Sequence, residues 1–312
     1  MIEHKKYRGR IIDIHTHIGS CDHYKTLGLG FFWSKLSVIE LIKHMRRRGI
    51  DYAVLLPSED VDDLEDEGFY IPTDCVLEIC KIFSEELVPF CWFEPRDPNL
   101  LNKIRDYVIN RGCRGVGEIK SRIRVDHPVL MKVYELCARL EVPVLIHLEN
   151  RYDYDIAAFE RVIKKYSSTV FIAHGPGWWR EISADADSRY WKKREVAKAE
   201  ENYPKGRVIP GGYVERLLDE CDNLYGDLSA YSGYNALVRD LEYARQFLRK
   251  FHKKLLYGSD GLDYFFPKYD LIRVMLEMDL EEGIYRDILY ENAAKLLKLI
   301  LKVSVLKGVS NF

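Results

Sequence analysis

The sequence predicts an α/β fold in which eight parallel strands alternate with helices and close into a (β/α)₈ barrel, or TIM barrel. Short apolar, β-branched runs occur eight times, and amphipathic charged segments separate them. Strands that alternate with helical segments indicate parallel βαβ units. The chain has 312 residues, and a barrel of this kind usually needs about 250. An open six-stranded sheet with an appended piece is the main alternative.

The predicted strands are short, as expected for strands buried on both faces of a barrel wall. In chain order they are Arg10–His15, Tyr52–Pro57, Val88–Phe93, Gly115–Lys120, Pro143–Leu148, Val170–His174, Leu224–Leu228 and Lys254–Gly258.

Between these strands, apolar residues recur at helical spacing. In Leu36–Arg48 the apolar residues follow three-residue steps, and a basic end precedes Gly49. The same pattern predicts helices at Leu100–Asn110, Pro128–Leu140, Ile156–Tyr166, Val214–Glu220 and Leu237–Phe251.

No linker or repeat divides the chain, so we expect one domain over residues 1–312. The longest irregular stretch, residues 175–213, follows the sixth strand and is too long for an ordinary loop. We expect it to form a lid or an inserted helical segment.

The composition limits the partners of the protein. With 47 basic and 49 acidic residues, the net charge is −2, which argues against a nucleic-acid partner. No apolar run reaches the roughly 18 residues of a membrane span, and no signal peptide is evident. We therefore expect a cytoplasmic protein with no membrane partner. The seven cysteines form no CxxC pair, so we expect buried free thiols.

Candidate metal ligands follow or end several predicted strands, where the functional residues of a barrel lie. They are His15, His17, Glu118, His147, His174 and Asp260. Side chains two residues apart on a strand point the same way, so His15 and His17 should project together into the barrel mouth. Imidazole and carboxylate groups suit Zn²⁺, and Mn²⁺, Fe²⁺ or Co²⁺ less selectively. We expect one or two divalent ions per chain.

The motifs "DIHTH", "GEIK", "LIHLE", "IAHGPG" and "YGSD" occur in this order. The order resembles the amidohydrolase superfamily of metal-dependent TIM-barrel hydrolases, and within it the amidohydrolase-related (amidohydrolase 2) branch. The resemblance continues to "DILYENAAKLLKL" near the C-terminus.

The resemblance also implies roles for the motif residues. It implies that His15, His17 and His147 bind metal. His174 would bind a second ion or polarise the substrate. Asp260 would bind metal and accept a proton from the attacking water.

Members of the superfamily differ at the fourth strand, where some use a carboxylated lysine, others a glutamate and others neither. Glu118 resembles the metal-bridging glutamate of the TatD-like deoxyribonucleases. We expect Glu118 to bind metal. Lys120 would pair with a carboxylate or bind an anionic substrate group, and a solvated rim lysine is the alternative.

Other residues are candidates for binding a small-molecule substrate. Trp178 and neighbouring aromatic residues after the sixth strand would form a wall against an apolar or aromatic substrate, and Arg180 would pair with the carboxylate of that substrate. These tryptophans would otherwise pack a lid or a subunit interface. Arg96 either faces the mouth or braces its loop, and Tyr231 follows the seventh strand. Whether the chain forms a homo-oligomer stays open.

The expected reaction is hydrolysis of an amide, ester or lactone by metal-activated water. The substrate would be a small molecule, and a carboxylate group and an aromatic ring are two features that it could carry. A metal-dependent decarboxylase of the same superfamily and a TatD-like phosphodiesterase are alternatives. A binding barrel that has lost activity is the non-enzyme alternative.

Overall fold

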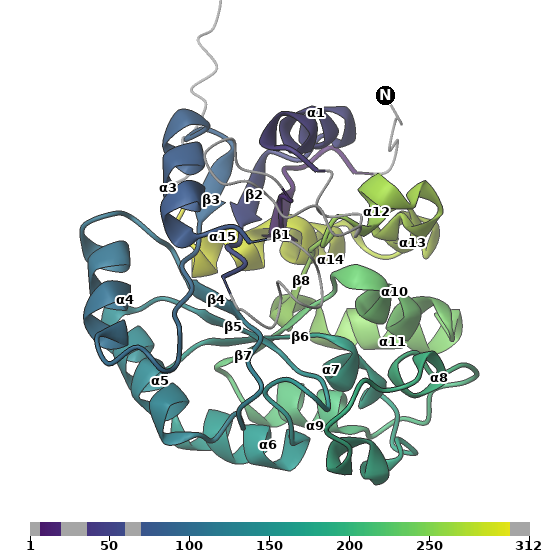
Figure 1. Cartoon of the computed structure of the whole chain (residues 1–312). Coiled ribbons are helices and arrows are strands. Elements are labelled where there is room, and N and C mark those ends of the chain that lie inside the picture. The colour runs from purple at the N-terminus through teal and green to yellow at the C-terminus, as the bar shows by residue number, and fades with distance from the viewer. Residues whose placement is uncertain (1–6, 20–35, 60–69, 300–312) are drawn as a thin grey trace, which may run out of the picture.

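Eight parallel strands form the wall of a barrel in the described part of the chain (Figure 1). The structure is a computed structural model, and it describes residues 7–19, 36–59 and 70–299. The strands are β1 (Ile12–Thr16), β2 (Tyr52–Leu55), β3 (Leu87–Pro89), β4 (Val116–Ile119), β5 (Val144–His147), β6 (Phe171–His174), β7 (Leu224–Asp227) and β8 (Leu255–Leu256). Each lies in or beside a predicted strand, so the sequence pattern located all of them.

The strand order closes the barrel. The ladders run β1-β2-β3 and β4-β5-β6-β7-β8, and all of their pairs are parallel. A parallel bridge between Cys91 and Val116 joins the two ladders beyond β3. The N–H of Ile14 donates to the carbonyl of Tyr257 at 3.0 Å, which joins β1 to the end of β8. The predicted (β/α)₈ barrel is therefore confirmed, and the open-sheet alternative is wrong.

Helices surround the strands (Figure 1). They are α1 (Val38–Arg48), α3 (Thr73–Ile82), α4 (Leu100–Ile109), α5 (Pro128–Leu140), α6 (Ile156–Lys165), α9 (Tyr213–Glu220), α10 (Ala230–Val238), α11 (Leu241–Phe251), α12 (Leu262–Phe265), α13 (Leu271–Glu277), α14 (Glu282–Arg286) and α15 (Asn292–Leu296). Among the described residues, no helix combines the length and apolar character needed to cross a membrane.

Local sequence explains where several helices begin and end. Ser37 and Glu40 form a reciprocal capping box at the start of α1, and Gly49 ends the helix with φ 70°. The predicted helix Leu237–Phe251 is instead split between α10 and α11. The reason is that the Asp240 side chain accepts the N–H of Tyr243 and starts a new helix there.

Residues 175–213 form the predicted helical insertion after β6. It contains α7 (Pro176–Arg180), the 3₁₀ helix η2 (Ser188–Lys192) and α8 (Ala199–Asn202), and it leads into α9. Trp178 and Trp179 of α7 are buried. Their rings contact Phe159 of α6 and Phe247 of α11, so these apolar contacts anchor the insertion to the barrel.

Apolar side chains fill the interior of the barrel below the C-terminal ends of the strands. We call this cluster of side chains the floor. Its buried members are Ile12, Ile14, Val54, Leu56, Val88, Phe90, Leu145, Ile172, Leu256, Tyr290, Ala293, Ala294 and Leu297. The last four come from the C-terminal helical segment, which closes this end. A larger apolar layer packs between the strands and the surrounding helices.

Two strands depart from regular pairing, and they are the strands that carry the first candidate ligands. The register shifts between Asp13 and Thr16 in β1 and between Val116 and Ile119 in β4. Gly117 has φ 134°, and a Cβ there would lie 2.4 Å from the carbonyl oxygen of Leu145. Only glycine fits this position, so the irregularity of β4 is built into the sequence.

The cysteines follow the expectation only in part. Those found as free thiols in the described residues are all buried, namely Cys80, Cys91, Cys113, Cys137 and Cys221. Cys75 is disulfide-bonded, so the expectation of free thiols is wrong for that residue.

Candidate metal centre

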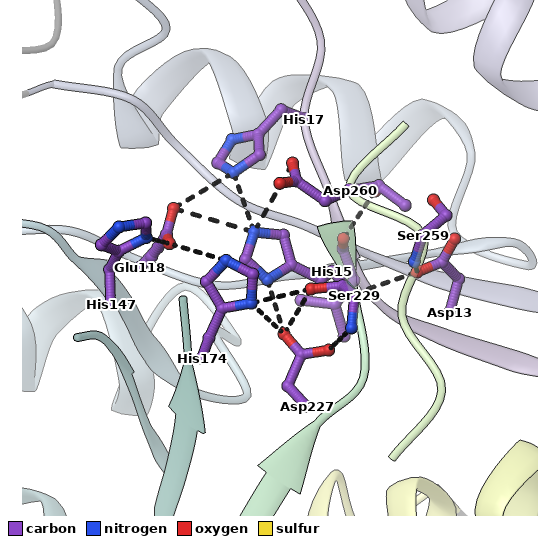
Figure 2. Close-up of polar contacts among 12 residues, drawn as sticks. Asp13, His15, His17, Glu118, His147, His174, Asp227, Ser229, Ser259 and Asp260 are labelled. Carbon is purple, nitrogen blue, oxygen red and sulfur yellow. Dashed lines mark hydrogen bonds and ion pairs between the residues drawn. The ribbon is translucent and has the colours of Figure 1, made fainter. Parts of the chain in front are cut away.

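The strand-end histidines and carboxylates meet in one cluster at the barrel mouth (Figure 2). His15 Nε2 lies 3.2 Å from His17 Nε2 and 3.8 Å from Asp260 Oδ1. Glu118 Oε2 lies 3.5 Å from His17 Nε2 and 3.7 Å from His15 Nε2. We call His15, His17 and Asp260 the first donor group.

A second donor group lies beside the first and consists of Glu118, His147 and His174. Glu118 Oε1 is 2.7 Å from His147 Nδ1 and 3.6 Å from His174 Nε2. Glu118 therefore presents Oε2 to the first group and Oε1 to the second, as Figure 2 shows. All six predicted ligands are thus brought together.

The spacing of His15, His17 and Glu118 fits a divalent ion. Two ligands bound tetrahedrally at about 2.0–2.1 Å lie roughly 3.3 Å from each other. The separations of 3.2, 3.5 and 3.7 Å among His15, His17 and Glu118 fall near this value. The donor set, with imidazole nitrogens and carboxylate oxygens, is the set that zinc and related ions prefer.

The electrostatics of the cluster also favour a cation. Burial raises the pKa of Glu118, but the His147 and His15 side chains outweigh this effect and hold the pKa well below its usual range. Burial lowers the pKa of His15, but Asp260 and Asp227 outweigh it and raise the pKa to about 10. The pKa of His147 is raised to about 9, because Glu118 outweighs the opposite effect of burial. The buried carboxylates thus attract positive charge into the cluster.

The structure adds residues that the sequence analysis did not single out. Asp227 ends β7, is fully buried, and lies 2.7 Å from His15 Nδ1 and 3.2 Å from His174 Nδ1. Asp13 accepts the backbone N–H groups of His15 and Ser259, at 3.1 and 2.9 Å. The strand-end rule applied to "LYGDLS" would have found Asp227. Asp13 had no such signal, since it sits inside an apolar run.

A cavity of about 500 Å³ opens beside the cluster. Its lining includes ligands of both groups, together with Lys120 and Tyr231 from the predicted substrate-binding residues. Aromatic side chains dominate one side, where the Tyr231 ring lies 5.0 Å from the ring centres of Tyr203 and Tyr269. The insertion contributes Pro176, Val196, Asn202 and Tyr203 to the lining.

Three predicted substrate-binding residues lie elsewhere, which corrects those expectations. Trp178 is fully buried and packs edge-on against Phe159 of α6, so it belongs to the apolar layer between the insertion and the barrel helices. Arg180 is buried, pairs with Glu181 at 2.7 Å and stacks on the Tyr190 ring.

Arg96 is the third of these residues, and its guanidinium is exposed and pairs with Glu94. It therefore braces its own loop, which was the other interpretation of the sequence. None of these three described residues lines the cavity.

Comparisons with known proteins extend these observations. No family model matches the chain, and no curated protein sequence matches it. Solved structures do match it. A probable 2-pyrone-4,6-dicarboxylic acid hydrolase from Acinetobacter baumannii is 15% identical, with a TM-score of 0.61 over 92% of this chain and 99% of that chain. An amidohydrolase from Burkholderia multivorans is 14% identical, with a TM-score of 0.63 over 94% and 100%.

A third match is 5-carboxyvanillate decarboxylase from Novosphingobium aromaticivorans, a mutant with bound manganese. It is 14% identical, with a TM-score of 0.57 over 95% of this chain and 98% of that chain. At these identities the likeness concerns the fold. The chain therefore has the TIM-barrel fold of these hydrolases and decarboxylases, which is the fold that the resemblance to the amidohydrolase superfamily implies.

Proposed function

We propose that the protein is a metal-dependent hydrolase that uses water to attack the carbonyl group of a small amide, ester or lactone. The observation that carries the proposal is the first donor group with Glu118, whose ligand atoms have the spacing of a tetrahedral metal site. This group lies beside a cavity large enough for a small molecule.

The first and second donor groups would hold one divalent ion each, with Glu118 bridging them. We propose Zn²⁺ as the resident ion, with Mn²⁺, Fe²⁺ or Co²⁺ as alternatives. Such an ion acts as a Lewis acid that lowers the pKa of water and polarises a carbonyl oxygen.

Asp260 is the proposed general base. Its side chain is 16% exposed, against 10% for Glu118, and it lines the cavity. The N–H of Asp260 donates to the carbonyl of His15 at 2.8 Å, which holds it beside the histidine pair. Asp260 would accept a proton from the attacking water and return it to the leaving group.

The cavity favours a planar substrate with an anionic group. Tyr203, Tyr231 and Tyr269 offer ring faces and edges to an apolar body. Lys120 and Arg151 place positive charge in the lining, with Lys120 Nζ 5.2 Å from the Tyr152 ring centre. We propose that the insertion, residues 175–213, covers this cavity.

A metal-dependent decarboxylase is the second candidate. The manganese-bound decarboxylase among the matching structures favours it, and so do the basic side chains of Lys120 and Arg151 in the cavity lining. Decarboxylation would use the same donor groups without net hydrolysis.

The test is a substrate panel with protein stripped of metal and reloaded with Zn²⁺ or Mn²⁺. The panel contains lactones, N-acyl amino acids, aromatic carboxylic acids and phosphodiesters. Hydrolysis of a lactone or acyl compound supports the proposal. Carbon dioxide release supports the decarboxylase, and phosphodiester cleavage supports the TatD-like alternative. Metal content below about 0.3 ions per chain after reloading would contradict all three readings.

A further inference from the structure

The side chain of Asp227 contacts two histidines and Ser229 inside the cluster. Its Oδ2 lies 2.7 Å from His15 Nδ1 and accepts the hydroxyl of Ser229 at 2.8 Å. The same oxygen lies 3.2 Å from His174 Nδ1. Its Oδ1 accepts the backbone N–H of Ser229 at 2.9 Å. One carboxylate therefore serves histidines from β1 and β6, as Figure 2 shows.

The backbone around Asp227 is shaped to hold it. A Cβ at Gly258 would lie 2.5 Å from Asp227 Oδ1 and 3.0 Å from the His15 Cβ, so a side chain at this position would displace both residues. The indole N–H of Trp179 donates to the main-chain carbonyl of Asp227 at 2.7 Å. The space left by Gly258 and the hydrogen bond from Trp179 together keep the carboxylate between the two histidines.

These contacts determine where the imidazole protons lie. An ionised carboxylate only accepts hydrogen bonds, so His15 must donate through Nδ1. The Ser229 hydroxyl donates to Asp227, and its oxygen lies 2.9 Å from His174 Nδ1, so His174 also donates through Nδ1. The Nε2 atoms of both rings then face the donor groups, and a neutral ring offers a lone pair there.

The two histidines belong to different donor groups. His15 Nε2 faces His17 and Asp260 of the first group, and His174 Nε2 faces Glu118 of the second. Asp227 could instead bind a third ion with the two Nδ1 atoms. Both of its oxygens, however, already accept hydrogen bonds from Ser229, one from the hydroxyl and one from the backbone N–H, which hold the carboxylate as an acceptor between the two rings.

We propose that Asp227 is a positioning residue that sets the Nδ1–H form of both His15 and His174, and so couples the affinities of the two ion positions. This inference rests on the proposed metal function for its effect on ions. The hydrogen bonds themselves do not depend on that function.

The test variant is Asp227→Asn. Both carboxylate oxygens accept hydrogen bonds, so an amide must turn its NH₂ either to the Ser229 N–H or to His15 Nδ1. The first arrangement breaks a backbone bond, and the second forces the His15 proton onto Nε2. Conservative replacement of such a partner typically weakens metal binding by about 10–100-fold.

Co²⁺ titrations followed by visible absorption measure the effect on the ions. His17→Ala and His147→Ala identify which step belongs to the first and which to the second donor group. We expect Asp227→Asn to weaken both steps by about 10–100-fold. Ser229→Ala removes the hydroxyl contacts to His174 and Asp227 but leaves the bond between Asp227 and His15, so it should weaken mainly the second step. If Asp227→Asn weakens only one of the two Co²⁺ binding steps, or if the wild type binds a single ion, the proposed coupling is wrong.

A spectroscopic readout separates positioning from folding. In ¹⁵N-histidine-labelled protein, with or without Zn²⁺, we expect exchange-protected Nδ1–H signals for His15 and His174, assigned with His15→Gln and His174→Gln. Asp227→Asn should lose the His15 signal. Asp13→Asn is the matched control, because Asp13 is a buried carboxylate that bonds to backbone N–H groups and to the Ser259 side chain rather than to an imidazole. It should keep both signals.

The outcomes remain decisive if a variant does not fold. Absence of these Nδ1–H signals from the folded wild type overturns the proposal. If the wild type shows these signals but binds no metal, the proposed function is refuted. The assignment of the Nδ1–H forms then stands, but the proposed coupling between the two ion positions fails.

Discussion

The floor and the mouth of the barrel are built from the same strands, only two residues apart. In β6, Ile172 belongs to the floor and His174 to the candidate metal centre. In β5, Leu145 and His147 divide in the same way. The floor buries apolar side chains and gains free energy from their removal from water. The mouth buries carboxylates and imidazoles, whose desolvation costs free energy unless partners offset it.

Stability and function therefore depend on different parts of the same barrel. Close packing makes the floor sensitive to the loss of even a few methylene groups. The mouth is held by hydrogen bonds between buried carboxylates and imidazoles, and a bound cation would replace the positive charge that the carboxylates draw to His15 and His147. We therefore expect substitutions in the floor to change the free energy of unfolding. Those in the mouth should change ion binding and turnover.

The largest expected effect is on turnover. Asp260→Asn should lower kcat by about 10²–10⁴-fold, because an amide cannot accept the proton of the attacking water at neutral pH. The far-UV spectrum and the melting temperature should stay close to those of the wild type. Steady-state kinetics on a substrate found with the panel measures this loss. Wild-type turnover in Asp260→Asn would remove this residue from the mechanism.

The largest expected effect on stability lies in the floor. Ile172→Ala should lower the free energy of unfolding by about 2–5 kcal/mol, because it leaves a cavity in a fully packed interior. Chemical denaturation measures this change. Elemental analysis of the folded variant should give wild-type ion content. Loss of ions from the folded variant would mean that floor and mouth are not separable.

Metal should stabilise the folded protein through the mouth. An ion that binds only the folded state stabilises it by about 2.7 kcal/mol at 100 times its dissociation constant. We expect Zn²⁺ to raise the melting temperature of stripped protein. Glu118→Gln should reduce the shift, since it weakens the residue that faces both donor groups. An equal shift in Glu118→Gln would contradict the bridging role.

The smallest expected effect concerns the rim of the mouth. Lys120→Ala should leave ion content unchanged and raise KM for an anionic substrate, because Lys120 lines the cavity outside both donor groups. Glu118→Gln is the contrasting variant, with reduced ion content. A carbamate on Lys120 bridging two ions, with Glu118 remote from both, would reverse this assignment.

Much of the candidate site follows from strand periodicity. His147 and His174 end regular strands, and each follows a floor residue by two positions, so their inward direction is readable from the sequence. The same rule fails in β1. Ile12 and Ile14 belong to the floor, so strict alternation would turn His15 away from the interior. The register shift between Asp13 and Thr16 accompanies the change of face that brings His15 inside.

The substrate-binding residues were harder to predict. Lys120 and Tyr231 reach the cavity, since each follows a ligand-bearing or neighbouring strand closely. Arg180 lies beyond β6 in the insertion, where it pairs with Glu181 and stacks on Tyr190. In a long insertion, local partners compete for each charged side chain, and sequence position alone does not say which partner prevails.

Local sequence is enough to predict the eight strands, their parallel order and the candidate ligands at their ends, because these depend on apolar runs and on spacing along one strand. Which atoms of these candidate ligands come into contact depends on the tertiary structure. Asp227 and His15 are 212 positions apart in the chain, yet a hydrogen-bond length of 2.7 Å separates their side chains. Such a contact depends on barrel closure and on register, which are set by packing among all the strands rather than by any one of them.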